Sequence, residues 1–157
     1  MHGFIKRISS EFNMCSSLKA LYCAFVRSQL EYAVVIWDPQ NLRDSFQIER
    51  VQRKFLKFAS FVLRIDCLPH DYAPVLAKLN IETLSTRRKN TNLVFLSKLL
   101  SGEVDAPDML GRVNFNVPGA NLRNFSPFRV PFCATNYLYN EPIIRMMTLA
   151  NDGSYNI

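Results

Sequence analysis

Apolar residues recur at helical spacing through most of the chain before residue 102, and the first such stretch is residues 18–37. Its sequence, LKALYCAFVRSQLEYAVVIW, predicts one long helix that is capped by Ser16 or Ser17. Pro39 is expected to stop this helix, because a residue that precedes proline is disfavoured in the α region. The stripe expected to be buried consists of Leu18, Leu21, Tyr22, Phe25, Tyr32, Ala33 and Ile36.

A second helical pattern, from about residue 46 to residue 63, separates apolar from basic side chains. Asp44 or Ser45 precedes it as a candidate N-terminal cap. Its apolar side gathers Ile48, Val51, Phe55, Phe58, Ala59 and Val62. Its opposite side gathers Arg50, Arg53, Lys54, Lys57 and Arg64. The pattern predicts a helix that lies on a core and turns cations outward, and it leaves open whether those cations are simply solvated or contact a polyanion.

Two more helices are predicted before residue 102. The segment VLAKL is short, whereas the other helix begins near Glu82 and ends at Gly102, since glycine is common just after a helix. Residues Leu93–Leu100 are apolar nearly all round the helix. This distribution predicts that they, with Phe95 among them, form the most buried element of the protein.

The residues TRRKN (86–90) lie in the first half of the helix that begins near Glu82, and they carry three cations. Arg88 falls on the apolar side, so its guanidinium needs a partner. The structural interpretation ties Arg88 to a carboxylate or to helix-end carbonyls, and the functional interpretation makes it a second contact to a polyanion backbone. Arg87 and Lys89 point away to either side.

The character of the chain changes after Gly102. Residues 103–157 contain five of the eight prolines and are rich in asparagine, a composition typical of turns and extended segments. The segments VNFNVP and FRVPF predict at most short edge strands, because proline cannot donate to a β-ladder. Pro142 is placed to open a final helix, PIIRMMTLAN. The predicted fold is mainly α, a bundle of about four to five helices followed by an irregular segment.

The net charge of +6 is concentrated in two segments. Residues 40–64 carry +4 and residues 82–102 carry +3, so the excess forms local patches. The four cysteines form no C-x-x-C pair and follow no apolar leader, which favours a reducing, intracellular location, nuclear or cytoplasmic. No membrane span is predicted, because no apolar run approaches the necessary length.

Residues suited to catalysis or to metal binding are scarce. The sequence has no adjacent aspartate pair for a two-metal centre and no glycine-rich phosphate loop. His70 is the only histidine apart from His2, and the two lack the spacing of metal ligands. We therefore expect no catalytic residues, no metal, no cofactor and no enzymatic activity from the chain itself.

Several segments in order resemble one protein family. GFIKR, LKALYCAFVRSQLEYAVVIWDP, IERVQRKFLKF, LSTRRKNTNLVFLSKLLSGEVDAPDML and VNFNVP are similar to the region that follows the polymerase core in reverse transcriptases of jockey-like non-LTR retrotransposons (LINE type) of animals. The resemblance spans nearly the whole chain. It implies a helical thumb-like domain over residues 1–102 and a C-terminal extension over residues 103–157 that packs on the helices. The family's palm, with its metal-binding aspartates, has no counterpart here.

The resemblance implies a non-catalytic part of an RNA-directed DNA polymerase. Its expected partners are the backbone of an RNA–DNA or DNA duplex, contacted through the parent enzyme, and the palm domain of the parent polyprotein. The expected nucleic-acid-binding residues are Arg50, Arg53, Lys54, Lys57, Arg87 and Lys89. The expected structural residues are Arg88, Trp37 and Phe95. The alternative is an inert or co-opted helical module that binds a protein and has no affinity for nucleic acid.

Overall fold

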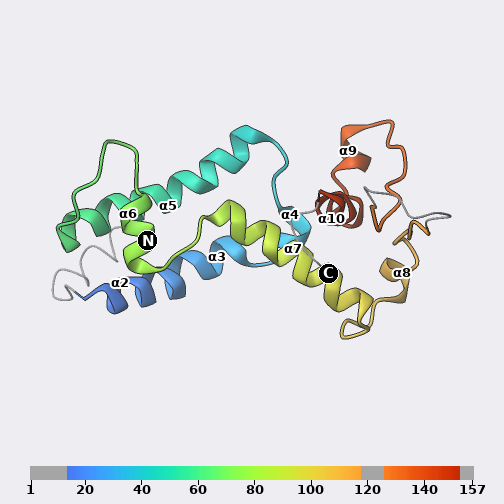
Figure 1. Ribbon diagram of the computed structural model, residues 1–157, viewed down its shortest axis with the longest axis horizontal. Helices are drawn as coiled ribbons and strands as arrows, with labels where there is room; N and C mark the ends of the chain where they lie inside the picture. The colour runs from blue at the N-terminus through green and yellow to red at the C-terminus, as the bar shows by residue number, and fades with distance from the viewer. Residues whose placement is uncertain (1–13, 118–125, 153–157) are drawn as a thin grey trace. The chain divides into compact units, whose positions relative to one another are not determined.

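The computed structural model describes residues 14–117 and 126–152 (Figure 1). The chain divides into two compact units, Met1–Arg88 and Lys89–Ile157. The division falls inside helix α7 (Leu84–Leu100) and not after residue 102, where the sequence placed the domain boundary. The described residues are mainly helical, which confirms the predicted fold class.

The single long helix predicted over residues 18–37 is wrong. The segment forms α2 (Cys15–Tyr22), the π-helical turn η1 (Cys23–Arg27), α3 (Ser28–Glu31) and α4 (Val34–Trp37). The break comes at Ala33, whose backbone is left-handed with φ of 51°. The π-helical turn and this break change the side of the chain that is buried, because both interrupt the 3.6-residue period. Leu18, Tyr22, Val26 and Val34 are buried, whereas Phe25, Tyr32, Ala33 and Ile36 are exposed.

The first unit is built around one apolar core. Helix α2 packs against α5 (Leu42–Leu63) and α6 (Ala73–Leu79), and α5 packs against α6 (Figure 1). The rings of Tyr22 and Phe55 stack at its centre with their centroids 4.3 Å apart. The buried core residues are Leu18, Tyr22, Val26, Phe55, Leu56, Ala59, Val75, Leu79 and Ile81. Removal of these side chains from water is the main stabilising contribution to this unit.

Helix α7 is followed by Gly102, as the sequence predicts, but its residues Leu93–Leu100 are less buried than predicted. Gly102 takes a left-handed φ of 77°, the conformation that favours glycine after a helix. Leu93, Leu96 and Leu99 are buried, but Phe95 is only half-buried and Val94 is exposed. The exposed side of this stretch carries Ser97 and Lys98 beside Val94, so Leu93–Leu100 are buried on one side only. The prediction that they form the most buried element is therefore wrong, since α10 (Pro142–Asn151) has the larger buried share.

The second unit contains three helices after α7 within the part that the structure describes. They are α8 (Pro107–Leu110), α9 (Asn136–Tyr139) and α10 (Pro142–Asn151). Helix α10 confirms the final helix predicted from the sequence, with Pro142 in its first turn, whereas α8 and α9 were not predicted. The buried Arg145 of α10 donates from Nη2 to Asn92 Oδ1 of α7 at 3.2 Å.

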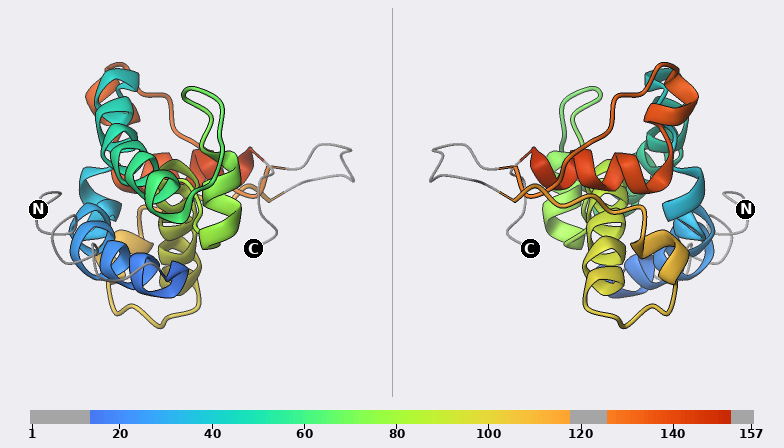
Figure 2. Two further views of the ribbon diagram at one scale, coloured as in Figure 1. Left: turned by 90° about the vertical axis from the view of Figure 1, so that its left-hand side faces the viewer. Right: turned by 90° about the vertical axis from the view of Figure 1, so that its right-hand side faces the viewer.

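An extended segment runs beside α10 in the second unit (Figure 2). The backbone N–H of Phe128 donates to Asn151 Oδ1 at 3.0 Å, and Asn151 Nδ2 donates back to the Phe128 carbonyl at 2.7 Å. Phe128 also forms an antiparallel bridge with Phe115, the only β pairing among the described residues. The segments expected to form short strands thus contribute one bridge. Pro118 of VNFNVP, and GFIKR near the N-terminus, lie outside the described residues.

Within residues 14–117 and 126–152, we find no helix with the length and apolar character needed to cross a membrane.

Candidate nucleic-acid interface

Helix α5 begins at Leu42, earlier than the sequence pattern predicted. Its N-terminal cap is Asn41, whose side-chain oxygen accepts the backbone N–H of Arg43 at 3.0 Å, so the expected cap by Asp44 or Ser45 is wrong. The helix ends at Arg64, which takes a left-handed conformation. Between these ends α5 is continuous, and a row of side chains along it keeps a constant direction.

The inner face of α5 is apolar with one exception. Phe55 and Ala59 are buried, as the spacing predicts for this side of the helix, and Leu56, which was outside the predicted apolar side, is buried as well. Gln52 is also buried, and it bridges to the beginning of α7. Its Nε2 donates to the Glu82 carbonyl at 2.8 Å, and its Oε1 accepts the first N–H of α7 at 3.1 Å. Because the first N–H groups of a helix lack partners within the helix, this glutamine anchors α7 to α5. Helical spacing does not predict the burial of Gln52, and a glutamine beside apolar positions is the one available signal in the sequence.

The outward face of α5 carries the cations predicted to lie there. Arg50, Arg53, Lys54 and Lys57 are all exposed, and we call them the α5 stripe. Salt bridges join several other cations of the described chain to carboxylates, but none of them includes a residue of the α5 stripe. Four positive charges therefore project into solvent from one helix without a carboxylate to neutralise them.

The side-chain contacts of Glu49 explain why no carboxylate pairs with the α5 stripe. Glu49 lies four residues before Arg53, the spacing at which a glutamate and an arginine pair on a helix surface. However, Glu49 Oε1 accepts instead from Arg88 Nη1 at 3.3 Å. The guanidinium of Arg53 lies over the ring of Phe46, 4.7 Å from its centroid, in a cation–π arrangement. The acid that could neutralise the α5 stripe is thus held on another side of the helix.

Arg88 has the carboxylate partners that its place on the apolar side required. Its Nε lies 3.0 Å from Asp38 Oδ1, and its Nη1 contacts Glu49. Its Nη2 donates to Ser45 Oγ at 2.9 Å. The side chain of Arg88 is only 4 % exposed, so the guanidinium joins the end of α4, helix α5 and helix α7 away from solvent.

Arg87 does not extend the α5 stripe, because its guanidinium is engaged by a carboxylate. The Nη2 of Arg87 donates to Glu31 Oε2 at 2.9 Å, and its Nε donates to Glu31 Oε1, which makes a forked contact. This hydrogen bonding raises the pKa of the Arg87 guanidinium. Lys89 is exposed but belongs to the second unit. The arginine that the sequence grouped with the phosphate-binding candidates is therefore engaged within the first unit.

Two aromatic residues near this region differ from one another in burial. Trp37, expected in the core, is 38 % exposed, and its Nε1 donates to the Tyr32 carbonyl at 2.5 Å beside the break before α4. Trp37 therefore stabilises the backbone at the break between α3 and α4. Tyr22 is fully buried, and its hydroxyl has no hydrogen-bond partner among the described residues. Burial raises the pKa of Tyr22 well above its ordinary range.

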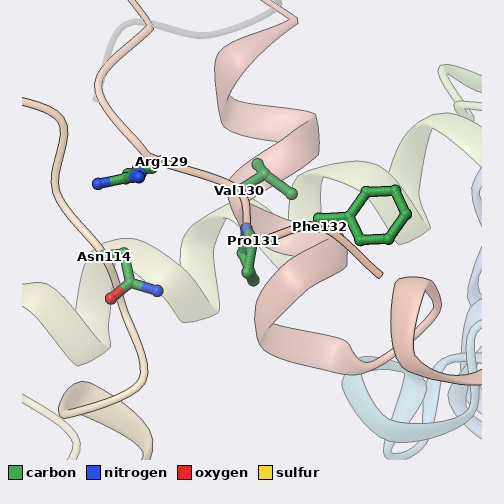
Figure 3. A pocket seen from close by; sticks show the side chains of 5 residues that line it. All are labelled: Asn114, Arg129, Val130, Pro131 and Phe132. Atoms are coloured by element: carbon green, nitrogen blue, oxygen red, sulfur yellow. The ribbon is translucent and has the colours of Figure 1, made fainter. Parts of the chain in front are cut away.

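The second unit has an open pocket of about 440 Å³ (Figure 3). It is lined by Asn114, Arg129, Val130, Pro131 and Phe132. The backbone N–H of Arg129 donates to the Asn114 carbonyl at 2.8 Å, which holds the two segments together. Figure 3 shows the ring of Phe132 pointing away from the side chains of Asn114 and Arg129. Arg129 is the one charged residue of this lining.

Comparison with known proteins adds no assignment to these features. No protein-family model, no curated protein and no solved structure matches the chain. Over the described residues, no group of three or more His, Cys, Asp or Glu side chains is placed to hold a metal ion. The α5 stripe is a group of exposed charges in the described chain that has no carboxylate in contact among the described residues.

Proposed function

We propose that the chain is the non-catalytic, thumb-like part of a retrotransposon RNA-directed DNA polymerase and that its α5 stripe contacts the template–primer backbone. The observation that carries the proposal is that four exposed cations on one helix face have no carboxylate partner among the described residues. The similarity of the sequence to reverse transcriptases of jockey-like elements supports the class of protein. The proposed partners are an RNA–DNA or DNA duplex and the palm domain of the parent enzyme.

The length of the α5 stripe suits a phosphate backbone. From Arg50 to Lys57 the helix advances by about 10 Å, which corresponds to about three base steps of one strand at 3.4 Å per step. Arginine offers a forked donor to a phosphate, and lysine offers a mobile point charge. Neither contact reads a base, and a polymerase that advances along its product needs contacts of this sequence-independent kind.

The alternative function, a helical module that binds a protein, has one observation in its favour. Leu42, Phe46 and Phe61 on α5 are large, apolar and exposed. Exposed apolar side chains grouped with polar neighbours are common at protein interfaces. The two functions differ in their response to salt, because release of counterions from a nucleic acid makes its binding strongly dependent on ionic strength.

A charge-reversal experiment tests the proposed function. The double variant Arg53→Glu, Lys54→Glu should bind both a mixed-sequence DNA duplex and an RNA–DNA hybrid much more weakly than the wild type. The matched control is Lys78→Glu, Lys98→Glu, which changes the net charge equally at exposed positions outside α5. It should bind within a fewfold of the wild type. Equal losses in the two double variants would show that only net charge matters, and no loss in the first would favour the protein-binding alternative.

A further inference from the structure

Phe61 lies on the basic side of α5, one helical turn beyond Lys57, and its side chain is 83 % exposed. At 3.6 residues per turn, Arg50, Lys54, Lys57 and Phe61 fall within about 60° of arc around the helix. A large apolar ring thus continues the row of cations on the outward face. The charge pattern on this side of the helix does not single out Phe61, because the ring is neutral.

The ring of Phe61 is more available for stacking than the other exposed ring on this side of α5. Phe46 already has the guanidinium of Arg53 over its face. Phe61 has neither an aromatic ring nor a cation against it within the part of the chain that the structure describes. Its flat surface is therefore open to an external planar group.

The electrostatics of α5 favour different parts of a nucleotide at different positions along the helix. Arg50, Lys54 and Lys57 attract phosphates, whereas the neutral ring at position 61 attracts none, and the next cation, Arg64, follows it at the C-cap. Phe61 lies in the last turn, whereas Arg50 and Lys54 lie nearer the middle of the helix. A strand whose phosphates follow the cations consequently brings a base toward Phe61.

We propose that Phe61 is a stacking platform for an unpaired base, so that α5 binds single-stranded nucleic acid through both backbone and base. Base–aromatic stacking tolerates any sequence, because every base presents a π face. Bases inside a duplex are already stacked on their neighbours and cannot offer that face to Phe61. This inference rests on the proposed contact between the α5 stripe and a phosphate backbone, and it adds the class of nucleic acid that the surface distinguishes.

The test compares two probes across variants at one position of the full chain. The probes are an oligothymidylate single strand and a long duplex, in which helix ends are a negligible fraction of the sites. Phe61→Ala should weaken binding to the single strand by roughly five- to a hundredfold and change binding to the duplex by less than about twofold. Phe61→Leu should resemble Phe61→Ala, because it keeps an apolar side chain but lacks a π face. Phe61→Trp should bind the single strand at least as tightly as the wild type.

Two comparisons make the result decisive. Phe132→Ala removes an exposed ring from the second unit and should leave both affinities unchanged. The circular dichroism spectrum and melting temperature should be the same for the wild type and for Phe61→Ala, since the ring is exposed. If Phe61→Ala or Phe61→Leu binds the single strand like the wild type, the stacking proposal is overturned. If the wild-type chain binds neither probe, the proposed function is overturned as well as the stacking proposal. If Arg53→Glu, Lys54→Glu loses both probes and the Phe61 variants lose neither, the backbone contact stands and only the stacking proposal is overturned.

Discussion

The cations of the α5 stripe and the arginines at the start of α7 carry the same charge in opposite surroundings. Arg53 and its neighbours on α5 face solvent without a carboxylate in contact. Arg87 is gripped by Glu31, and Arg88 is buried against Asp38 and Glu49. Net charge alone does not distinguish the two regions, since both are basic segments of the sequence. The difference teaches that the position of the nearby acids decides whether a basic segment stabilises the fold or remains available to a partner.

Glu49 connects the two regions. Its spacing from Arg53 favours a pair within α5, yet in the structure it contacts Arg88 of α7. A buried arginine without a carboxylate is far more costly than an exposed arginine without one, since water solvates the exposed charge. The contact of Glu49 with the buried Arg88 therefore stabilises the fold more than a contact with the exposed Arg53 would.

The largest effect should follow the loss of the buried guanidinium. Arg88→Met leaves Asp38 and Glu49 without their main partner, and we expect the free energy of unfolding to fall by about 3 kcal/mol or more. Denaturant melts measure this change. A double variant that also contains Asp38→Asn should recover part of the loss, because it removes one of the two stranded charges. A melt of Arg88→Met that matches the wild type would contradict the structural role of this residue.

The buried hydroxyl of Tyr22 also tests the rule that a buried polar group without a partner lowers stability. Tyr22→Phe removes a hydroxyl that has no hydrogen-bond partner among the described residues and retains the ring that stacks on Phe55. We expect the free energy of unfolding to rise by about 1 kcal/mol at neutral pH. A clear loss of stability would mean that the hydroxyl has a partner.

The pH dependence of stability gives a second observable for Tyr22. Burial raises the pKa of Tyr22 in the folded chain, so the folded state holds its proton more tightly than the unfolded state. Stability from this difference is fully present below about pH 10 and is lost as the pH rises above that value. Denaturant melts at increasing alkaline pH should therefore show a steeper loss for the wild type than for Tyr22→Phe.

Arg87 should show an intermediate effect. Its side chain is 29 % exposed and its forked contact is with one carboxylate, so Arg87→Ala should cost about 1 kcal/mol of unfolding free energy. Binding of nucleic acid should be nearly unaffected, since this guanidinium is engaged with Glu31. If Arg87→Ala weakens duplex binding as strongly as a variant of the α5 stripe, the proposed interface extends to α7.

The smallest effect on stability should come from the α5 stripe. Arg53→Ala removes an exposed charge and its contact with Phe46, and we expect the free energy of unfolding to change by less than about 0.5 kcal/mol. Its effect on binding should exceed its effect on folding. A loss of stability comparable to that of Arg88→Met would assign the α5 stripe to the fold.

Hydrophobic periodicity was sufficient to predict the continuous elements. Helices α5, α6, α7 and α10 follow from it, as does the outward direction of Arg53 on α5. The break at Ala33 was not predictable, because alanine is the strongest helix former and no glycine or proline marks the site. The half-burial of Phe95 and the exposure of Trp37 do not follow from the pattern either, since it gives the spacing of apolar residues and not which of them another element covers.

The sequence predicts which face of α5 carries the cations, but it does not predict which cations pair with carboxylates. Sequence spacing gave the direction of the cations on α5, but contacts such as that between Arg87 and Glu31 join positions far apart in the chain. Periodicity contains no information on such pairs. The same limit explains why Gln52, which bonds to residues at the start of α7, was overlooked.

The salt dependence of hybrid binding tests the central claim most directly. The logarithm of the affinity for an RNA–DNA hybrid should fall linearly with the logarithm of the salt concentration, by a slope of about 0.9 for each phosphate contact on a duplex. Replacing Arg50, Arg53, Lys54 and Lys57 together by glutamine should flatten that slope by roughly three to four units, with the melting curve unchanged. If the fourfold variant keeps both the affinity and the slope of the wild type, the α5 stripe is a solvated helix face and does not bind a nucleic-acid backbone.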